Sequence, residues 1–148
     1  MILAIDPGSA QSAFVLFDPW KQRIVSMGIE QNPVVLKQLT LGTPRMTVFA
    51  IERVASFGFC VGKEVFETCE WVGRFLHAAE RQPITIFPVY RKQVVTHHTG
   101  KSTNGDKEIR AAMIDRFAKE KLAGCKYDLW SALAIAAYVC DKVTDTSK

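Results

Sequence analysis

The chain is predicted to form an α/β domain in which helices flank a five-stranded mixed sheet. Three strand-like segments come first, at Ile2–Ile5, Ala13–Phe17 and Arg23–Ile29, with no helical pattern between them. Strand-like and helical segments then alternate, which is typical of a mixed α/β sheet. No internal repeat interrupts this order. A chain of 148 residues and 16.6 kDa suffices for one core, so we predict a single domain over residues 1–143 and a polar tail at 144–148.

The first half contains a hairpin and a short helix. Asp18–Lys21 separates the second strand from the third, and Pro19 presets the backbone dihedral that a turn needs. Pro33 opens a helix through Leu39, and Gly42 and Pro44 end it.

The second half alternates strands with apolar residues at helical spacing. Its predicted strands are Met46–Ile51 and Ile84–Val89, and its predicted helices are Val61–Ala79, Tyr90–Thr96, Asp106–Lys121 and Tyr127–Val143. Asp106 is the predicted N-cap of its helix. The polar stretch His97–Gly105 is expected to be a mobile loop.

The composition of the chain limits the cellular location, the cysteine chemistry and the partners that we expect for the protein. Hydrophobic residues make up 48% of the chain and charged residues 23%, as in an ordinary globular protein. No segment is apolar for long enough to span a bilayer, and Ile2–Ile5 is too short for a secretory signal, so a cytoplasmic location is expected. The four cysteines lack metal-type spacing and are predicted to be reduced thiols in apolar surroundings. The net charge of +4 permits a nucleic-acid partner without requiring one.

Three acidic residues lie at the ends of predicted elements. Asp6 and Glu52 each follow an apolar strand, and Asp128 lies in the first turn of the last helix. If the two strands are neighbours, about 4.8 Å apart, both carboxylates meet at one sheet edge, where a crossing helix could bring Asp128. Simpler roles remain open: Asp6 could cap a turn, Glu52 could pair with Arg53 or Arg23, and Asp128 could cap its helix.

A set of carboxylate oxygens without a His or Cys cluster suits Mg²⁺, or alternatively Mn²⁺, better than zinc. Such a site can hold two ions about 4 Å apart on a phosphodiester, one activating water and the other stabilising the leaving oxygen.

Three ordered motifs resemble the RuvC family of Holliday junction resolvases. They are Ala4–Ser9 (AIDPGS), Phe49–Val54 (FAIERV), and Asp128 ahead of Ser131–Ala136 (SALAIA). Their order and spacing agree over nearly the whole chain. The segment Phe57–Phe75 is most similar to the phage-borne branch of that family, and this similarity implies a phage-encoded protein that acts in a bacterial host.

The resemblance implies a ribonuclease H-like fold, a homodimer, and paired Mg²⁺-dependent nicks in a four-way DNA junction. Asp6, Glu52 and Asp128 match three acidic positions of the family, and Lys107 matches a lysine near the scissile phosphate. Such a lysine could stabilise developing charge. The chain departs from the family at Ser131, where a fourth acid is usual. Three carboxylates plus water could suffice, or another acid such as Asp106 could enter.

Basic residues along the expected cleft would contact DNA phosphates without reading sequence. They are Arg53, Lys63, Arg74, Arg91, Lys92, Lys101, Lys107 and Arg110. Phe57 and Phe59 follow Glu52, in the loop where the family uses an aromatic residue to separate bases. His97 and His98 are interpreted as exposed loop residues, although a role at the site when DNA binds stays open.

Two further expectations concern partners and competing functions. The Val61–Ala79 helix is apolar on more than one side, which favours a homodimer contact there, although one deep core would also account for it. A non-catalytic or weakly cutting branched-DNA-binding protein is the first alternative, because of Ser131. A YqgF-like nuclease acting on structured RNA is the second. An actin-like nucleotide-binding fold is set aside because its two domains need a longer chain, so no nucleotide cofactor is expected.

Overall fold

The computed structural model describes residues 1–42, 45–55, 58, 60–118, 122, 125–126 and 128–145. The strands are β1 (Ile2–Pro7), β2 (Gln11–Asp18), β3 (Arg23–Gln31), β4 (Val48–Arg53) and β5 (Thr85–Tyr90). The helices are α1 (Asn32–Leu41), α2 (Lys63–Glu80), α3 (Arg91–Thr99), α4 (Asp106–Arg116) and α5 (Asp128–Asp145). None of the helices in the described ranges is long and apolar enough to cross a membrane.

The five strands form one mixed sheet in the order β3-β2-β1-β4-β5, which confirms the predicted fold class. β1, β2 and β3 pair antiparallel as a meander, whereas β4 lies parallel to both β1 and β5. Each parallel crossover carries a helix, as such connections require. The hairpin turn is present, and the carboxylate of Asp18 accepts hydrogen bonds from the backbone N–H groups of Trp20 and Lys21.

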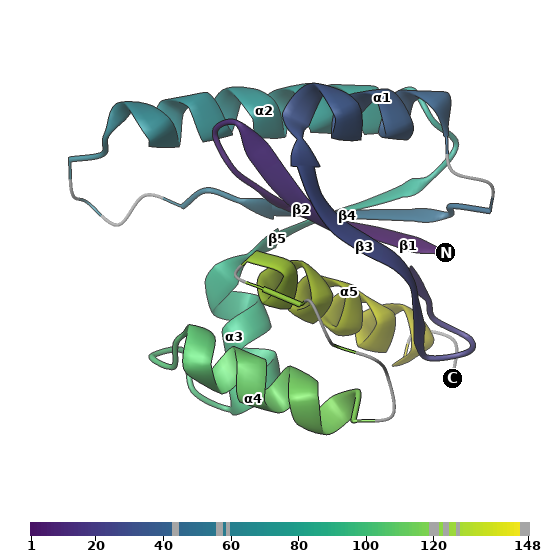
Figure 1. Cartoon of the computed structure of the whole chain (residues 1–148), viewed down its shortest axis with the longest axis vertical. Coiled ribbons are helices and arrows are strands. Elements are labelled where there is room, and N and C mark those ends of the chain that lie inside the picture. The colour runs from purple at the N-terminus through teal and green to yellow at the C-terminus, as the bar shows by residue number, and fades with distance from the viewer. Residues whose placement is uncertain are drawn as a thin grey trace.

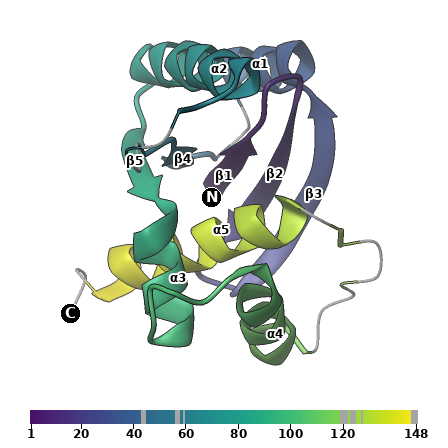
Figure 2. The same ribbon diagram turned by 90° about the vertical axis from the view of Figure 1, so that its left-hand side faces the viewer.

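The sheet separates two helical layers (Figure 1). α1 and α2 pack on one face, against alternate strand residues such as Leu3, Ile5 and Phe49. α3, α4 and α5 lie on the other side (Figure 2), where α5 covers the alternate set that includes Ala4 and Ala50. The run of small residues at 132, 134, 136 and 137 of α5 is fully buried, because alanines let a helix approach a sheet closely.

Several boundaries differ from the sequence prediction. α3 continues through Thr99, so His97 and His98 are helical and do not belong to a mobile loop. The N-cap of α4 is Gly105, and Asp106 is the first helical residue. α4 ends at Arg116, before the predicted Lys121, and α5 extends two residues past Val143. Element ends are the least defined part of a periodic pattern, because capping depends on tertiary partners.

A buried polar network fixes the turn that follows Asp6. Asn32 is fully buried and donates a hydrogen bond to the carbonyl of Gly8 (2.9 Å). The Ser12 hydroxyl donates to Asn32 Oδ1 (2.6 Å), and the Asn32 N–H donates to the carbonyl of Ala10 (3.0 Å). A Cβ at Gly8 would come within 2.5 Å of the Gln11 carbonyl oxygen, so only glycine fits this turn. The start of α1 therefore holds the end of β1 in place.

Candidate active site

Strand register brings Asp6 and Glu52 to the same edge and face of the sheet. Ile5 of β1 pairs in parallel with Ile51 of β4, so the two acids are the next residues along neighbouring strands. Side chains alternate between faces along a strand, and Ala4 and Ala50, two positions earlier, both pack toward α5. Both carboxylates therefore lie on the α5 side, as the sequence analysis expected.

Asp6 is surrounded by the charges of the two other predicted acids. Burial raises the pKa of its carboxyl to about 8, and the nearby Glu52 and Asp128 carboxylates add to the increase. The guanidinium of Arg91 and a hydrogen bond with Ser131 oppose it. β1, β4 and the first turn of α5 thus bring three acids into one electrostatic environment.

Glu52 responds to the same cation. Burial raises the pKa of Glu52, the charge of Arg91 opposes the increase, and Asp106 adds to it. The cation that acts on Glu52 is therefore Arg91, the first residue of α3, rather than Arg53 or Arg23.

Arg91 also contacts Ser131, the residue that stands where the resembled family usually has a fourth acid. Its Nη1 donates to the Ser131 hydroxyl (3.3 Å), and its Nη2 forms an ion pair with Asp106 at the start of α4. The side chain thus joins α3, α4 and α5 beside the carboxylates. The sequence marked Arg91 only as a DNA contact, because no local pattern reveals a partner 40 residues away.

The donor chemistry fits a hard divalent cation, since Asp6, Glu52, Asp128 and Ser131 offer only oxygens. Clustered carboxylates also repel one another, so they need a cation or a proton to offset this repulsion. The raised pKa of Asp6 shows that its carboxyl holds a proton more tightly for this reason as well as because of burial. Within the described ranges, no group of three or more His, Cys, Asp or Glu side chains is placed to hold one ion together. The raised pKa of Asp6 is compatible with the lack of a formed ligand group among the residues described. Charges act on one another over several ångströms, whereas Mg²⁺ needs its ligands at about 2.1 Å.

A pocket of about 580 Å³ opens beside Asp128 and is lined in part by Lys107, the predicted catalytic lysine. Lys107 and Arg110 of α4 line it together with Asp128 and Ser131 of α5. The guanidinium of Arg110 lies 5.6 Å from the centre of the Trp130 ring. The structure therefore brings Lys107 to the same pocket as one predicted acid.

The other predicted DNA contacts divide between the two sides of the sheet. Arg53, Arg91 and Lys92 share a second pocket with Glu52. Lys63 and Arg74 lie on α2, in the opposite layer, where Lys63 pairs with Glu67 (3.1 Å) and Arg74 lies over the Trp71 ring (4.6 Å). Lys101 is exposed between α3 and α4. Phe57 and Phe59 lie outside the described residues.

His97 and His98 were interpreted as exposed loop residues, but both are helical; His97 is exposed as predicted, whereas His98 is half-buried. His98 Nε2 donates to the Ala134 carbonyl of α5 (2.8 Å), and burial lowers the pKa of its imidazole. His97 Nε2 lies 2.8 Å from Asp141 Oδ2. Asp141 also accepts two hydrogen bonds from Arg116, each 2.7 Å long. The histidines thus attach α3 to α5, and a polar run can look like a loop when its partners lie far along the chain.

The cysteines are free thiols, as predicted, but only two lie in apolar surroundings. Cys125 and Cys140 are buried, whereas Cys60 and Cys69 are exposed. Burial raises the pKa of the Cys125 thiol to about 11, so this thiol is inert as a nucleophile or metal ligand at neutral pH.

The fold matches solved structures of two resolvases. RuvC of Thermus thermophilus superposes with a TM-score of 0.70 at 19% identity, over 93% of this chain and 91% of that one. The same enzyme in complex with a Holliday junction substrate gives 0.70 at 20% identity, over 93% and 90% of the two chains. The Fowlpox virus resolvase, bound to substrate Holliday junction DNA, gives 0.57 at 12% identity, over 96% and 97%.

The sequence matches no protein-family model, and a search of curated proteins also finds no match. At these levels of identity the structural likeness shows the fold alone. The chain therefore has the RuvC-type α/β fold that its three acidic motifs led us to expect.

Proposed function

We propose that the protein is a Mg²⁺-dependent endodeoxyribonuclease that cuts four-way junctions or other branched DNA by paired nicks. The observation that carries this proposal is the convergence of three acids at one end of a RuvC-type fold, where the charges of Glu52 and Asp128 act on Asp6. RuvC and the poxvirus resolvase, which share that fold, have been solved with junction DNA, and this supports the substrate class.

The chemistry assigns a role to each group. Asp6, Glu52 and Asp128 would hold up to two Mg²⁺ ions, or Mn²⁺, which supply an activated water and stabilise the leaving oxygen. Lys107 faces the same pocket as Asp128 and provides a positive charge for the phosphate as negative charge develops. Arg53, Arg91, Lys92 and Arg110 surround the acids and hold the DNA backbone.

The deciding experiment uses a synthetic four-way junction with purified protein. Cutting is expected with Mg²⁺ and not with a chelator. Asp6→Asn is expected to abolish cutting while junction binding persists, because the amide keeps the shape of the side chain but removes the charge. Cleavage that survives this substitution would contradict the assigned site.

Ser131 favours a second candidate, a branched-DNA-binding protein that cuts weakly or not at all. Arg91 donates to the Ser131 hydroxyl, so a cation lies at the position where the family has a fourth acid. Tight junction binding with no cutting by the unaltered protein in Mg²⁺ or Mn²⁺ would establish this candidate. Preferential cutting of an RNA hairpin would instead establish a nuclease for structured RNA.

A further inference from the structure

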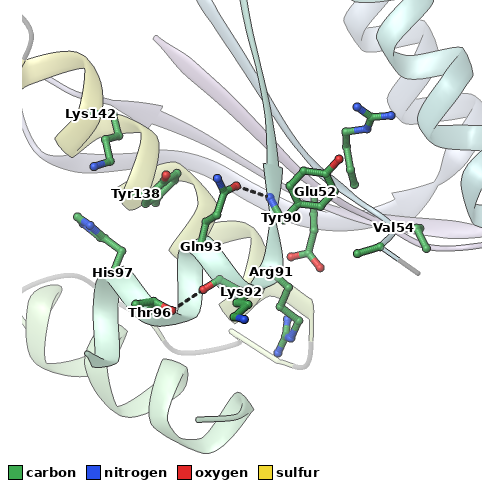
Figure 3. Close-up of a pocket in the computed structure, with 12 residues that line it drawn as sticks. Glu52, Val54, Tyr90, Arg91, Lys92, Gln93, Thr96, His97, Tyr138 and Lys142 are labelled. Carbon is green, nitrogen blue, oxygen red and sulfur yellow. Dashed lines mark hydrogen bonds between the residues drawn. The ribbon is translucent and has the colours of Figure 1, made fainter. Parts of the chain in front are cut away.

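A groove of about 850 Å³ extends away from the candidate active site along α3, and neither Asp6 nor Asp128 lines it. We call it the α3 groove. Its walls are Glu52–Ala55 at the end of β4, Tyr90–Gln93 with Thr96 and His97, and Tyr138 and Lys142 of α5. Figure 3 shows Glu52 and Arg91 toward one end and His97 and Lys142 toward the other. A ligand in this groove would therefore continue from the catalytic acids.

The charge of the α3 groove favours a polyanion. Arg53, Arg91, Lys92 and Lys142 line it. Among the lining residues that the structure describes, Glu52 is the one carboxylate, and it lies at the end that adjoins the candidate active site. Fixed cations along a groove attract a phosphate backbone and concentrate it there. A strand that carries its phosphates past Arg91 would reach Glu52 directly.

Two aromatic rings in the groove favour unpaired bases. Tyr90 is 39% exposed, and the guanidinium of Arg53 lies 6.0 Å from the centre of its ring. Farther along, Lys142 Nζ lies 5.6 Å from the centre of the Tyr138 ring, and the His97 ring meets the same tyrosine edge-on at 5.1 Å. Aromatic rings next to cations are the usual binding surface for single strands, whereas a duplex hides its base faces in the stack.

The position of the groove leaves it accessible in the homodimer that the sequence led us to expect. α3 and α5 lie on the opposite side of the sheet from α2, the helix expected to contact a second copy (Figure 1). α3 rises about 9 Å from Arg91 to His97, enough for a short run of nucleotides.

We propose that the α3 groove binds an unpaired stretch of DNA strand next to the cleavage site, so that branched substrates with a single-stranded arm bind more tightly than fully paired junctions. This inference rests on the proposed function, because it names the substrate class that the same site prefers. Bases would stack on Tyr90 and Tyr138 while phosphates contact Arg53, Lys92 and Lys142.

The test compares two labelled junctions by fluorescence anisotropy in the Asp6→Asn background, which prevents cutting. One junction is fully paired, and the other has one arm replaced by oligothymidylate. The single-stranded arm is expected to increase affinity about tenfold, from the stacking of one to two bases. Tyr138→Leu and Lys142→Gln should each remove most of that gain, whereas Tyr138→Phe, which keeps the ring, should retain it.

Two control substitutions remove a cation or an aromatic ring outside the α3 groove. Lys37→Gln on the exposed side of α1 and Trp20→Leu at the β2–β3 turn should leave the gain unchanged. Equal affinity for the two junctions, or a gain that survives both Tyr138→Leu and Lys142→Gln, would overturn the inference. A stronger preference for an oligouridylate arm would overturn its assignment to DNA. Failure of the proposed function gives a different result, namely no cutting of any branched DNA by the protein with Asp6 intact.

Discussion

At the scale of single residues, the ionised carboxylate of Asp6 is held in the folded protein at a cost in stability. Its carboxyl is half-buried, near two other acids, and its pKa is raised to about 8. A raised carboxyl pKa means that the folded protein binds a proton more tightly than the unfolded chain does. The stabilisation is therefore fully present below pH 4 and is lost as the pH rises toward 8. Without a cation, the ionised site opposes folding.

Asp6→Asn is therefore expected to stabilise the metal-free protein at alkaline pH. In chelator at pH 8.5 the midpoint of thermal unfolding should rise by about 3 °C for each kcal/mol of repulsion relieved. At pH 4 the two proteins should differ least, because the Asp6 carboxyl is then neutral in the folded protein and largely protonated in the unfolded chain as well. Calorimetry at both pH values measures this. A variant that is less stable than the wild type at pH 8.5 would show that the carboxylate has a compensating partner.

At the scale of elements, Arg91 couples three helices to the acids. As the first residue of α3 it reaches Asp106 of α4 and Ser131 of α5, and its charge lowers the pKa values of Asp6 and Glu52 against the effect of burial. The exposed Arg91–Asp106 pair contributes about 0–1 kcal/mol to stability. The importance of Arg91 is electrostatic, since a fixed cation among these acids would compete with a metal ion held there while attracting phosphate.

Arg91→Gln should therefore change metal and DNA binding in opposite directions. Removing the cation lets the acids attract Mg²⁺ more strongly, so half-maximal cutting should need about threefold less Mg²⁺. Junction affinity should fall, because one phosphate contact is lost. A Mg²⁺ titration of cutting at saturating protein, with junction binding measured in chelator, tests both effects.

Lys92→Gln is the matched control, because Lys92 lines the α3 groove and its charge is not among those that act on Asp6 or Glu52. It should weaken DNA binding and leave the Mg²⁺ requirement unchanged. An Arg91→Gln protein whose Mg²⁺ requirement is unchanged or higher would show that the guanidinium does not compete with the metal.

The sequence predicts the helices and strands but not the side-chain contacts between them. The sequence predicted that Asp6 and Glu52 would meet at one sheet edge, because each follows an apolar strand. The parallel pairing of Ile5 with Ile51 brings the two acids to that edge. The roles of Arg91 and His97 could not be predicted, since their partners Ser131 and Asp141 lie 40 and 44 residues away. The residues at 97–105 are polar and lack the apolar spacing that indicates a helix. The first of them are helical because α3 packs against α5, and that contact cannot be read from the local sequence.

At the scale of the whole molecule, the sheet separates the candidate active site from the exposed face of α2. α3, α4 and α5 carry the pockets that contain Lys107, Asp128 and the α3 groove. On the opposite side α2 buries Val72 and Phe75 against the sheet and leaves Phe66 61% exposed. A large exposed aromatic on a long helix is typical of a protein–protein contact. A junction has two strands to cut, so two copies joined through α2 would supply two sites.

Phe66→Glu is accordingly expected to convert a dimer into a monomer, because a charge at the centre of an apolar contact would be buried without a partner. Light scattering after gel filtration should give twice the 16.6 kDa chain mass for the wild type and the single mass for the variant. Trp20→Glu, at an 80% exposed position outside α2, is the control and should leave the mass unchanged. On a cruciform plasmid the wild type should produce linear DNA, whereas the monomer should produce mostly nicked circles, since one site cuts one strand per encounter. A monomeric wild type, or a variant that remains dimeric, would exclude α2 as the contact. Linear products from a monomer would show that paired nicking does not require a dimer.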